Sequence, residues 1–276
     1  MAFHSPQRIA QLAVEAGTRK ATLPLGSMLI LGFLAGAFIS LGYLLDIRVV
    51  ADLPEEWGTF GTFLGAAVFP VGLILIIIAG GELLTGNMMA VSIACLSRQV
   101  TIRQLLINWF WITISNFIGA LFVAYCFGHV AGLIEAGPYL TKTVAIAQAK
   151  LGEDFWESLF SAIGCNWLVG LAVWLAYGAE DIGGKILAIL FPIMGFVAIG
   201  FQHVVANMFV IPAAIFAGHF SWADYISNFI PVFIGNAIGG SMFVAMAYWI
   251  AYLGYTTPAA SSENKLHQMK NRKIRR

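Results

Sequence analysis

Charged side chains are scarce in this sequence, and their scarcity excludes an ordinary soluble domain. Only 11% of the 276 residues are Asp, Glu, Lys or Arg, while 59% are hydrophobic and the mean hydropathy is +0.83. A soluble domain of this length could not cover so much apolar surface with so few charges. We therefore expect a protein that folds within a lipid bilayer and has no nucleic-acid partner.

Cysteine and histidine are also few, which bears on cofactors. The three cysteines, Cys95, Cys126 and Cys165, are scattered at spacings that match no metal or redox motif, so we expect them to be packing residues. Of the five histidines, only His203 is expected deep inside a span, whereas a haem-binding membrane cytochrome needs paired histidines at that depth. We expect no cofactor, no bound metal and no enzymatic activity.

Long charge-free runs take the place of the missing charges. They cover 21–45, 57–81, 83–97, 104–134, 158–179, 186–223 and 225–262. A helix needs about 20 apolar residues to cross the hydrocarbon core, so these runs predict an all-α polytopic membrane protein with six transmembrane helices. The predicted spans are roughly 26–45, 61–96, 105–127, 157–177, 186–217 and 230–254, with the second broken at 80–87 and the fifth at 200–206.

Three segments are expected along the chain. Residues 1–20 should form an amphipathic helix that begins at Ser5-Pro6, where serine would be the N-cap and proline the first helical residue. Residues 21–255 should form a six-helix transmembrane domain, and 256–276 a basic tail. No secretory signal is evident, because the first apolar run is long enough to span and no convincing cleavage site follows it.

The distribution of lysine and arginine predicts the orientation. If the N-terminus lies inside, 12 of the 15 Lys and Arg residues lie on the inner side. Only Arg48, Lys142 and Lys150 then lie on the outer side. The positive-inside rule therefore places both termini in the cytoplasm.

A pattern of nine residues occurs twice, 120 positions apart, and both copies interrupt an apolar run. The first copy, at 80–88, reads GGELLTGNM, and the second, at 200–208, reads GFQHVVANM. The same offset aligns NFIG at 116–119 with NAIG at 236–239, and Asn108 with Asn228. This duplication predicts two related halves, about 26–127 and 157–254. Since each half has three spans, an odd number, the fold is expected to be a 3+3 inverted repeat with two broken helices.

The two breaks place polar backbone groups at membrane depth, where only protein or a water-filled cavity can satisfy them. Each resumed half-helix would direct its partly positive N-terminus toward the bilayer midplane, which favours an anion or a polar solute. Asn87 and Asn207 are expected to hydrogen-bond the broken backbone as structural groups rather than as solute ligands.

His203 and Thr85 are the candidate solute-binding groups of the two breaks. The ordinary imidazole pKa of about 6.5 allows histidine to donate a proton near neutral pH. The Thr85 hydroxyl can donate to a carboxylate or accept from His203, and a backbone-capping role for it is equally open. Buried histidines are more often structural, but the position of His203 inside a helix break favours a function in transport.

Glu82 is the one acid expected inside a span, and Gln202 occupies its position in the second half. A free carboxylate at the bilayer centre costs at least about 2.5–3.5 kcal/mol. We therefore expect Glu82 to be a structural latch that accepts backbone N–H bonds at the break or orients a neighbour, away from the path of an anion.

Two stretches resemble the paired signatures of the formate–nitrite transporter family: GELLTGN at 81–87 and GFQHVVANMFVIP at 200–212. The residues from Lys20-Ala21 to Pro24, followed by GFLAGAFISLG at 32–42, resemble the first-span motif of that family. The resemblance extends from about residue 5 to 255. It implies an aquaporin-like protomer, a homopentamer with one pore per protomer, and a prokaryotic inner or plasma membrane.

Position by position, the resemblance implies roles for individual residues. His203 matches the central pore histidine and Thr85 the threonine of the mobile loop after the first break. Lys150 matches a vestibule lysine that attracts anions, and Asn166 a pore-side asparagine. Two constrictions are implied, one lined by Phe69 and Phe196 and the other by Leu73 and Leu83. From the sequence alone, these four apolar side chains would be assigned to helix packing.

Gln202 departs from the family, which commonly has Glu directly before the central histidine. An amide gives less support to a protonated histidine than a carboxylate does. A mechanism that requires a permanently charged His203 is therefore disfavoured in this chain.

The expected function is transmembrane transport of a small monovalent weak-acid anion, with formate in first place, through a pore with a central histidine and with proton coupling. Nitrite, hydrosulfide and short monocarboxylates such as acetate or lactate are alternatives, since no pore residue distinguishes them. A neutral-solute facilitator of the aquaporin type is a further alternative, against which the lack of paired Asn-Pro-Ala triplets weighs.

Overall fold

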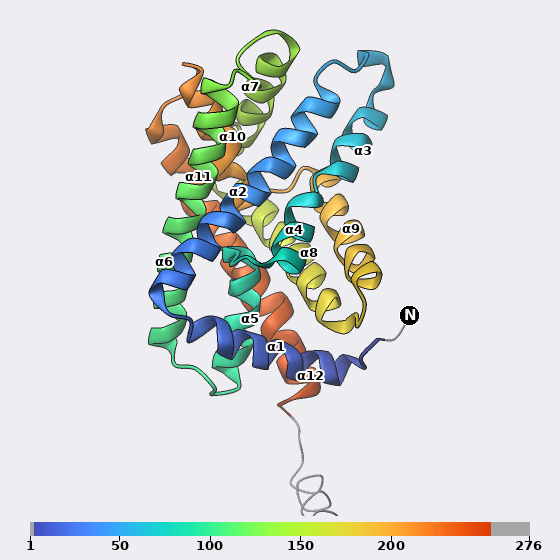
Figure 1. Cartoon of the computed structure of the whole chain (residues 1–276), viewed down its shortest axis with the longest axis vertical. Coiled ribbons are helices and arrows are strands. Elements are labelled where there is room, and N and C mark those ends of the chain that lie inside the picture. The colour runs from blue at the N-terminus through green and yellow to red at the C-terminus, as the bar shows by residue number, and fades with distance from the viewer. Residues whose placement is uncertain (1–2, 255–276) are drawn as a thin grey trace, which may run out of the picture.

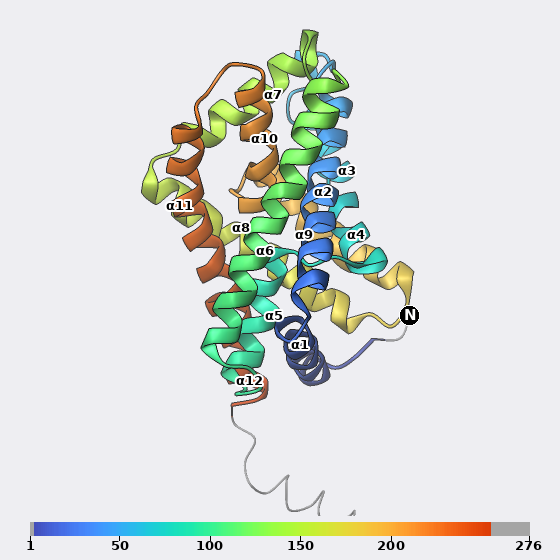
Figure 2. The same cartoon turned by 60° about the vertical axis from the view of Figure 1, so that its left-hand side comes forward.

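The computed structural model describes residues 3–254, which form an elongated bundle of helices (Figures 1 and 2). In chain order the elements are α1 (Pro6–Ala21), α2 (Leu25–Val50), η1 (Glu55–Trp57), α3 (Thr59–Val68), α4 (Val71–Leu75), η2 (Ile76–Gly80), α5 (Leu84–Leu96), α6 (Ile102–Phe122), η3 (Val123–Val130), α7 (Gly137–Leu151), α8 (Phe155–Gly178), α9 (Ile182–Ile199), α10 (Val204–Phe216), α11 (Trp222–Ile238), η4 (Gly239–Met246) and α12 (Ala247–Tyr252). The segment η1 is a 3-10 helix, and η2, η3 and η4 are π-helices. The predicted basic tail, 256–276, lies outside the described residues.

Within residues 3–254, six helical stretches are long and apolar enough to cross a membrane, which confirms the predicted number of spans. They are Leu25–Val50, Thr59–Gly80, Ile102–Val130, Phe155–Gly178, Ile182–Ile199 and Trp222–Tyr252. Two shorter apolar helices, α5 and α10, follow the second and fifth stretches, where the sequence predicts broken spans. The chain is an all-helical multi-pass membrane protein.

Side chains that cap helix N-termini set where several helices begin. Ser5 accepts a hydrogen bond from the backbone N–H of Arg8, with Pro6 in the first turn of α1, as the sequence predicts. Capping boxes begin α6 (Thr101 with Gln104), α8 (Asp154 with Glu157) and α11 (Ser221 with Asp224). The last of these boxes explains why the sixth span begins at Trp222 and not near 230.

Glycines let α2 and α6 lie against each other at close range. A Cβ atom at Gly36 would overlap the carbonyl oxygen of Asn116, and one at Gly119 would overlap the carbonyl oxygen of Phe33. Gly32 is crowded by α6 in the same way. The small residues of the first span therefore allow this close contact between the two helices.

Helix α7 lies where the sequence predicts a loop between the third and fourth spans. Thr141, Lys142 and Thr143 lower the hydropathy of this stretch well below that of a span, so the search for charge-free runs misses it. Pro138 lies in the first turn of the helix, where its lack of a backbone N–H costs nothing.

Asp46 corrects the expectation that Glu82 is the one acid within a span. The first span continues to Val50 instead of ending near 45, so Asp46 lies within α2 and is only 7% exposed. Gly65 of α3 lies against its carboxylate, and a Cβ atom there would overlap it. The charge-free run ends at 45 because a charge follows, although the helix does not end there.

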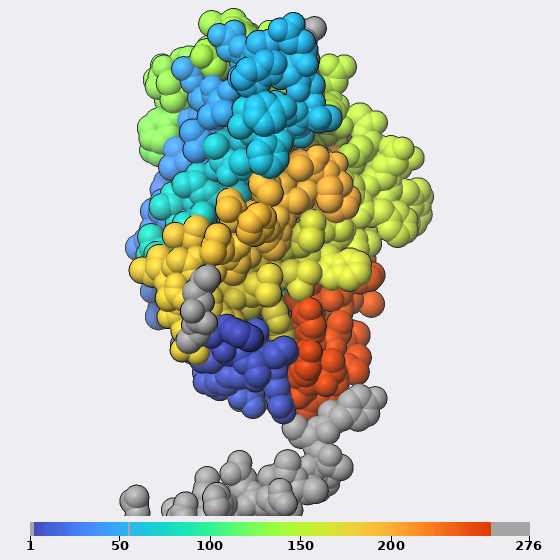
Figure 3. Space-filling view, turned by 90° about the vertical axis from the view of Figure 1, so that its right-hand side faces the viewer, coloured from blue at the N-terminus to red at the C-terminus, as the bar shows by residue number. Residues whose placement is uncertain are grey.

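The two ends of the bundle carry different helices. Helix α1 lies across one end, beside the last helical segment, and α7 lies at the other end (Figures 1 and 3). The short helix α5 extends toward the α1 end, and α10 extends toward the α7 end (Figures 1 and 2). The two breaks that precede α5 and α10 therefore lie near the middle of the bundle.

Candidate functional site

Each break is a short stretch of chain between two helices. Gly80, at the end of η2, has a φ of 105°, and Gly200, directly after α9, has a φ of 88°. Such positive φ values favour glycine. Helix α5 begins at Leu84 and α10 at Val204, so both predicted breaks are confirmed but are a few residues shorter than expected.

Asn116 of α6 holds the backbone of the first break. Its Oδ1 accepts a hydrogen bond from the backbone N–H of Leu84 at 2.9 Å. Its Nδ2 donates to the carbonyl oxygens of Glu82 at 2.9 Å and Gly32 at 2.8 Å. The side chain is fully buried, so it satisfies three backbone groups that lipid could not.

Asn236 of α11 holds the second break with an equivalent set of bonds. Its Oδ1 accepts from the backbone N–H of Val204 at 2.8 Å. Its Nδ2 donates to the carbonyl oxygens of Gln202 at 3.0 Å and Ala162 at 2.8 Å. Each bond at the first break therefore has a counterpart at the second, as a duplicated chain predicts.

Glu82 is held by a second network at the first break, in which its carboxylate accepts from two side chains and not from the backbone N–H groups predicted as its donors. Its Oε1 accepts from Lys20 Nζ at 2.9 Å and its Oε2 from Asn87 Nδ2 at 2.8 Å. Asn87 Nδ2 also donates to Asn108 Oδ1 at 3.0 Å, and Asn108 Nδ2 donates to the Lys20 carbonyl at 3.0 Å. Asn87 thus bonds to side chains, not to the broken backbone as predicted, because the shorter break places it inside the first turns of α5.

Gln202 occupies the matching network at the second break. Its Oε1 accepts from Asn207 Nδ2 at 2.7 Å, and its Nε2 donates to the Lys150 carbonyl at 3.0 Å. Asn207 Nδ2 also donates to Asn228 Oδ1 at 2.9 Å, and Asn228 Nδ2 donates to the Lys150 carbonyl at 2.9 Å. Here too the prediction for Asn207 is corrected, since it bonds to the side chains of Gln202 in the break and Asn228 in α11, and not to the broken backbone.

His203 joins the two breaks through Thr85. The His203 Nδ1 accepts from the backbone N–H of Ala206 at 3.0 Å, which makes His203 the N-cap of α10. Since Nδ1 is an acceptor, Nε2 carries the proton of the neutral ring and donates to Thr85 Oγ1, 3.0 Å away. Both side chains are almost completely buried, so the contact predicted between them is present at the centre of the bundle.

Two small cavities meet at His203. The first, of about 30 Å³, is lined by Tyr43, Phe69, Lys150, Phe196, Val197, Phe201, His203, Ala206 and Asn207. The second, of about 10 Å³, is lined by Ile39, Phe69, Leu73, Leu83, Val169, Ile193, Phe196 and His203. A single water molecule needs about 10–15 Å³ of such space, so neither cavity admits an anion together with its hydration shell.

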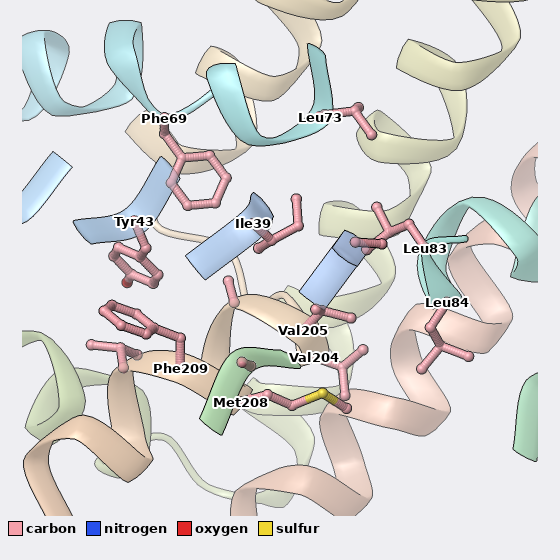
Figure 4. Packing of buried hydrophobic residues seen from close by; sticks show 14 of the residues in the cluster. Ile39, Tyr43, Phe69, Leu73, Leu83, Leu84, Val204, Val205, Met208 and Phe209 are labelled. Carbon is pink, nitrogen blue, oxygen red and sulfur yellow. The ribbon is translucent and has the colours of Figure 1, made fainter. Parts of the chain in front are cut away.

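Phe69, Phe196 and His203 border both cavities and therefore stand between them. The rings of Phe69 and Phe196 meet edge to face, with centroids 5.6 Å apart, and Phe196 stacks on the His203 ring at 5.6 Å. Figure 4 shows Phe69 and Leu73 on one side of Ile39. The residues of each implied constriction therefore lie close together: the Phe69 ring contacts the Phe196 ring, and Leu73 and Leu83 both border the second cavity.

Lys150, near the end of α7, reaches the rim of the first cavity. Its Nζ donates to the carbonyl oxygens of Gly200 at 2.6 Å and Phe201 at 3.0 Å. Burial lowers the pKa of Lys150 below its ordinary value, and the carboxylate of Glu153 acts in the opposite direction. The Lys150 Nζ therefore faces the backbone of the second break at the α7 end of the bundle.

Comparison with known proteins identifies the family of the chain. The family model described as formate/nitrite transporter matches residues 7–250. The chain belongs to the formate/nitrite transporter family.

Relatives within the formate/nitrite transporter family cover nearly the whole chain. An uncharacterized transporter of Bacillus subtilis, YrhG, is 66% identical over 91% of this chain and 95% of its own. The formate channel BtFdhC of Bacillus thuringiensis is 62% identical over 91% of this chain and 97% of its own. Two further relatives support the same assignment to a family of transporters: a probable formate transporter of Methanothermobacter thermautotrophicus and the formate channel FocA of Escherichia coli, 42% and 32% identical.

Solved structures of the formate/nitrite transporter family share the fold. A structure described as an FNT family ion channel has a TM-score of 0.79 and 29% identity, over 89% of this chain and 98% of the other. A pentameric formate channel with formate bound has a TM-score of 0.71 and 29% identity, over 83% and 98%. The predicted all-helical fold with six spans is therefore confirmed as that of the family.

Asn166 lies beside the site but borders neither cavity. Its Nδ2 donates to the carbonyl oxygens of Asn236 at 2.6 Å and Thr85 at 3.3 Å, and the side chain is fully buried. Its Oδ1 has no hydrogen-bond partner. In this arrangement Asn166 positions the backbone beside Thr85 and lines neither cavity, although the resemblance implied a pore-side residue.

Several residues of the site were not identified as site residues from the sequence. Asn116, Asn236, Asn108 and Asn228 complete the networks at the two breaks, and the 120-residue register could have identified all four as partners of the breaks. Tyr43, which borders the first cavity, carried no such signal. Within residues 3–254, no group of three His, Cys, Asp or Glu side chains is placed to hold a metal ion.

Proposed function

We propose that the chain transports a small monovalent weak-acid anion, with formate in first place, across a membrane. The pairing of His203 with Thr85, at the point where the two cavities meet, is the observation that carries this proposal. It is supported by the name of the 62% identical relative, a formate channel, and by the structural neighbour with formate bound. Vesicles that contain the purified protein should take up labelled formate, and uptake equal to that of protein-free vesicles would refute the proposal.

The order of the residues suggests a path from the α7 end to the α1 end. An anion that enters from the α7 end meets Lys150 at the first cavity, then Phe69, Phe196 and His203. Beyond them the apolar second cavity leads to Leu73 and Leu83. A bare charge is costly in such surroundings, so the solute crosses this part of the path as the neutral acid.

His203 serves this path as a neutral hydrogen-bond donor. A charged imidazolium would need a proton on Nδ1, and that proton would break the bond from the Ala206 N–H. We therefore assign the protonation of the anion to water at the Lys150 end, or to His203 when its cap opens. The Thr85 hydroxyl accepts from His203 and keeps its own proton to donate to the solute.

Lys150 offers the first test of this path. Replacing Lys150 with glutamine should raise the half-saturation concentration for formate about tenfold at low salt, because a focused positive charge raises the local anion concentration. The matched control is Lys142→Gln, which removes a positive charge from the same helix but borders neither cavity. Equal half-saturation concentrations for the two variants would take Lys150 out of the path.

Nitrite is the nearest alternative solute, since it matches formate in charge and size. Hydrosulfide and short monocarboxylates remain further alternatives. A neutral-solute facilitator of the aquaporin type would move glycerol, and a swelling assay of the reconstituted protein distinguishes it. We propose no enzymatic activity, because the candidate groups are arranged around a path and not around a reacting bond.

We further propose that the chain assembles as a homopentamer with one path in each protomer. The description of a structural neighbour as a pentameric channel supports this assembly. Residues 21–255 would form the transport domain, with its halves as inverted copies. The excess of basic residues at the α1 end supports cytoplasmic termini in a prokaryotic cell membrane. The mass of the complex in detergent tests the assembly.

A further inference from the structure

Each of the two break networks includes one lysine, and the backbone carbonyl groups of these lysines occupy the same place in the two networks. The carbonyl oxygen of Lys20 accepts from Asn108 Nδ2 at 3.0 Å, and that of Lys150 accepts from Asn228 Nδ2 at 2.9 Å. Lys20 lies in the last turn of α1 and Lys150 in the last turn of α7, and these two helices lie at opposite ends of the bundle (Figure 1). The surroundings of their ammonium groups differ.

At the α1 end the lysine charge is neutralised. Lys20 Nζ lies 2.9 Å from Glu82 Oε1, and Glu82 is only 6% exposed. Burial alone would lower the pKa of Lys20, but the Glu82 carboxylate holds this pKa above its ordinary value. The pair presents no net charge to an anion that approaches from this end.

At the α7 end the place of that carboxylate is taken by an amide. Gln202 Nε2 donates to the Lys150 carbonyl and, as an amide nitrogen, cannot accept a bond from an ammonium group. Lys150 Nζ turns to the Gly200 and Phe201 carbonyl oxygens instead. The four ion pairs found in residues 3–254 do not include Lys150. Glu153 acts on it only from beyond ion-pair distance.

We propose that Gln202 is a positioning residue that determines anion affinity: it leaves the Lys150 ammonium unneutralised, so the path binds anions more strongly from the α7 end than from the α1 end. The carbonyl oxygens that hold Lys150 are dipoles and do not cancel its charge. In a partly buried site of low dielectric, one uncompensated charge acts strongly on a small anion. This inference rests on the proposed function and concerns the same path.

Gln202→Glu tests the proposal, because it places a carboxylate where Glu82 stands in the first half. Formate uptake is measured from each end, in vesicles whose protein has one known orientation. The half-saturation concentration from the α7 end should rise about tenfold, with the maximal rate and the uptake from the α1 end little changed. The same substitution in a Lys150→Gln background should have no effect on half-saturation.

The proposal would be overturned if Gln202→Glu changed the half-saturation concentration equally with and without the Lys150 ammonium. It would also be overturned if Gln202→Glu did not change the half-saturation concentration at all. If Gln202→Glu does not fold, the unmodified protein provides the test. Its half-saturation concentration should rise with ionic strength more steeply from the α7 end than from the α1 end. Equal slopes would contradict the proposed asymmetry.

If the protein moves no formate, only the proposed function is refuted. Measurements of anion binding then test the role of Gln202. Sodium formate and sodium nitrite should raise the unfolding temperature of the unmodified protein. This rise should be lost in Lys150→Gln and reduced in Gln202→Glu. The same rise in all three proteins would refute the role of Gln202.

Discussion

Replacing His203 with alanine is expected to reduce formate uptake about ten- to hundredfold. The variant loses the Nε2 donor between the two cavities, and a buried polar group left without its partner costs about 1–3 kcal/mol. It also loses the cap on the Ala206 N–H, which costs about 0.5–2 kcal/mol of stability. Initial rates of uptake at acidic and neutral pH, normalised to folded protein, measure the effect.

His203→Asn is the matched control for that substitution. Asparagine is a good N-cap and keeps a polar donor at the site, but it does not titrate. If His203 acts as a neutral donor, the asparagine variant retains uptake that a proton gradient drives. Loss of gradient-driven uptake in this variant would show that the ring must carry the proton, and unchanged uptake in His203→Ala would remove His203 from the path.

Asn236→Ala is expected to have the largest effect on stability. The substitution leaves the Val204 N–H and the carbonyl oxygens of Gln202 and Ala162 without this partner, in a part of the bundle closed to water. Each buried polar group left unpaired costs about 1–3 kcal/mol. Whole domains have about 5–15 kcal/mol of stability, so most of the protein should fail to fold at growth temperature.

The yield of folded protein and its unfolding temperature in detergent measure this effect. Ser227→Ala is the control, because Ser227 lies on the same helix and makes an exposed bond to the Asp224 carbonyl. Asn116→Ala should behave as Asn236→Ala does, since it serves the first break in the same way. An unfolding temperature of Asn236→Ala equal to that of Ser227→Ala would show that Asn236 does not hold the second break.

The spans and the breaks could be predicted because both depend on local properties of the sequence. A run of apolar residues long enough to cross a bilayer has few other uses, and the matched GGELLTGNM and GFQHVVANM stretches mark interruptions in two such runs. The contact between Thr85 and His203 followed from the same match, since two breaks at the same depth bring their polar residues together.

The networks around the breaks could be predicted only in part. The register indicated Asn116 and Asn236, but not which carbonyl groups remain unpaired once the helices stop, and that decides their partners. Helix α7 was missed because its stability comes from packing against α10 and not from a long apolar run. Lys150 depends on α7, so its contact with the second break could not be derived either.

The apolar residues of the path could not be derived from patterns at all. Phe69, Phe196, Leu73 and Leu83 are buried like any core residue, and nothing local separates a side chain that lines a path from one that packs. The family resemblance implied them, and the geometry places all four around the two cavities.

Formate transport through the path at His203 is tested by uptake of isotope-labelled formate into proteoliposomes, with a proton gradient on or off and unlabelled nitrite as competitor. We expect uptake that the gradient drives and that His203→Ala slows. Weak competition by nitrite would support formate as the solute, and strong competition would assign a broader anion path. Formate uptake absent under both conditions, in a folded protein, would contradict the account.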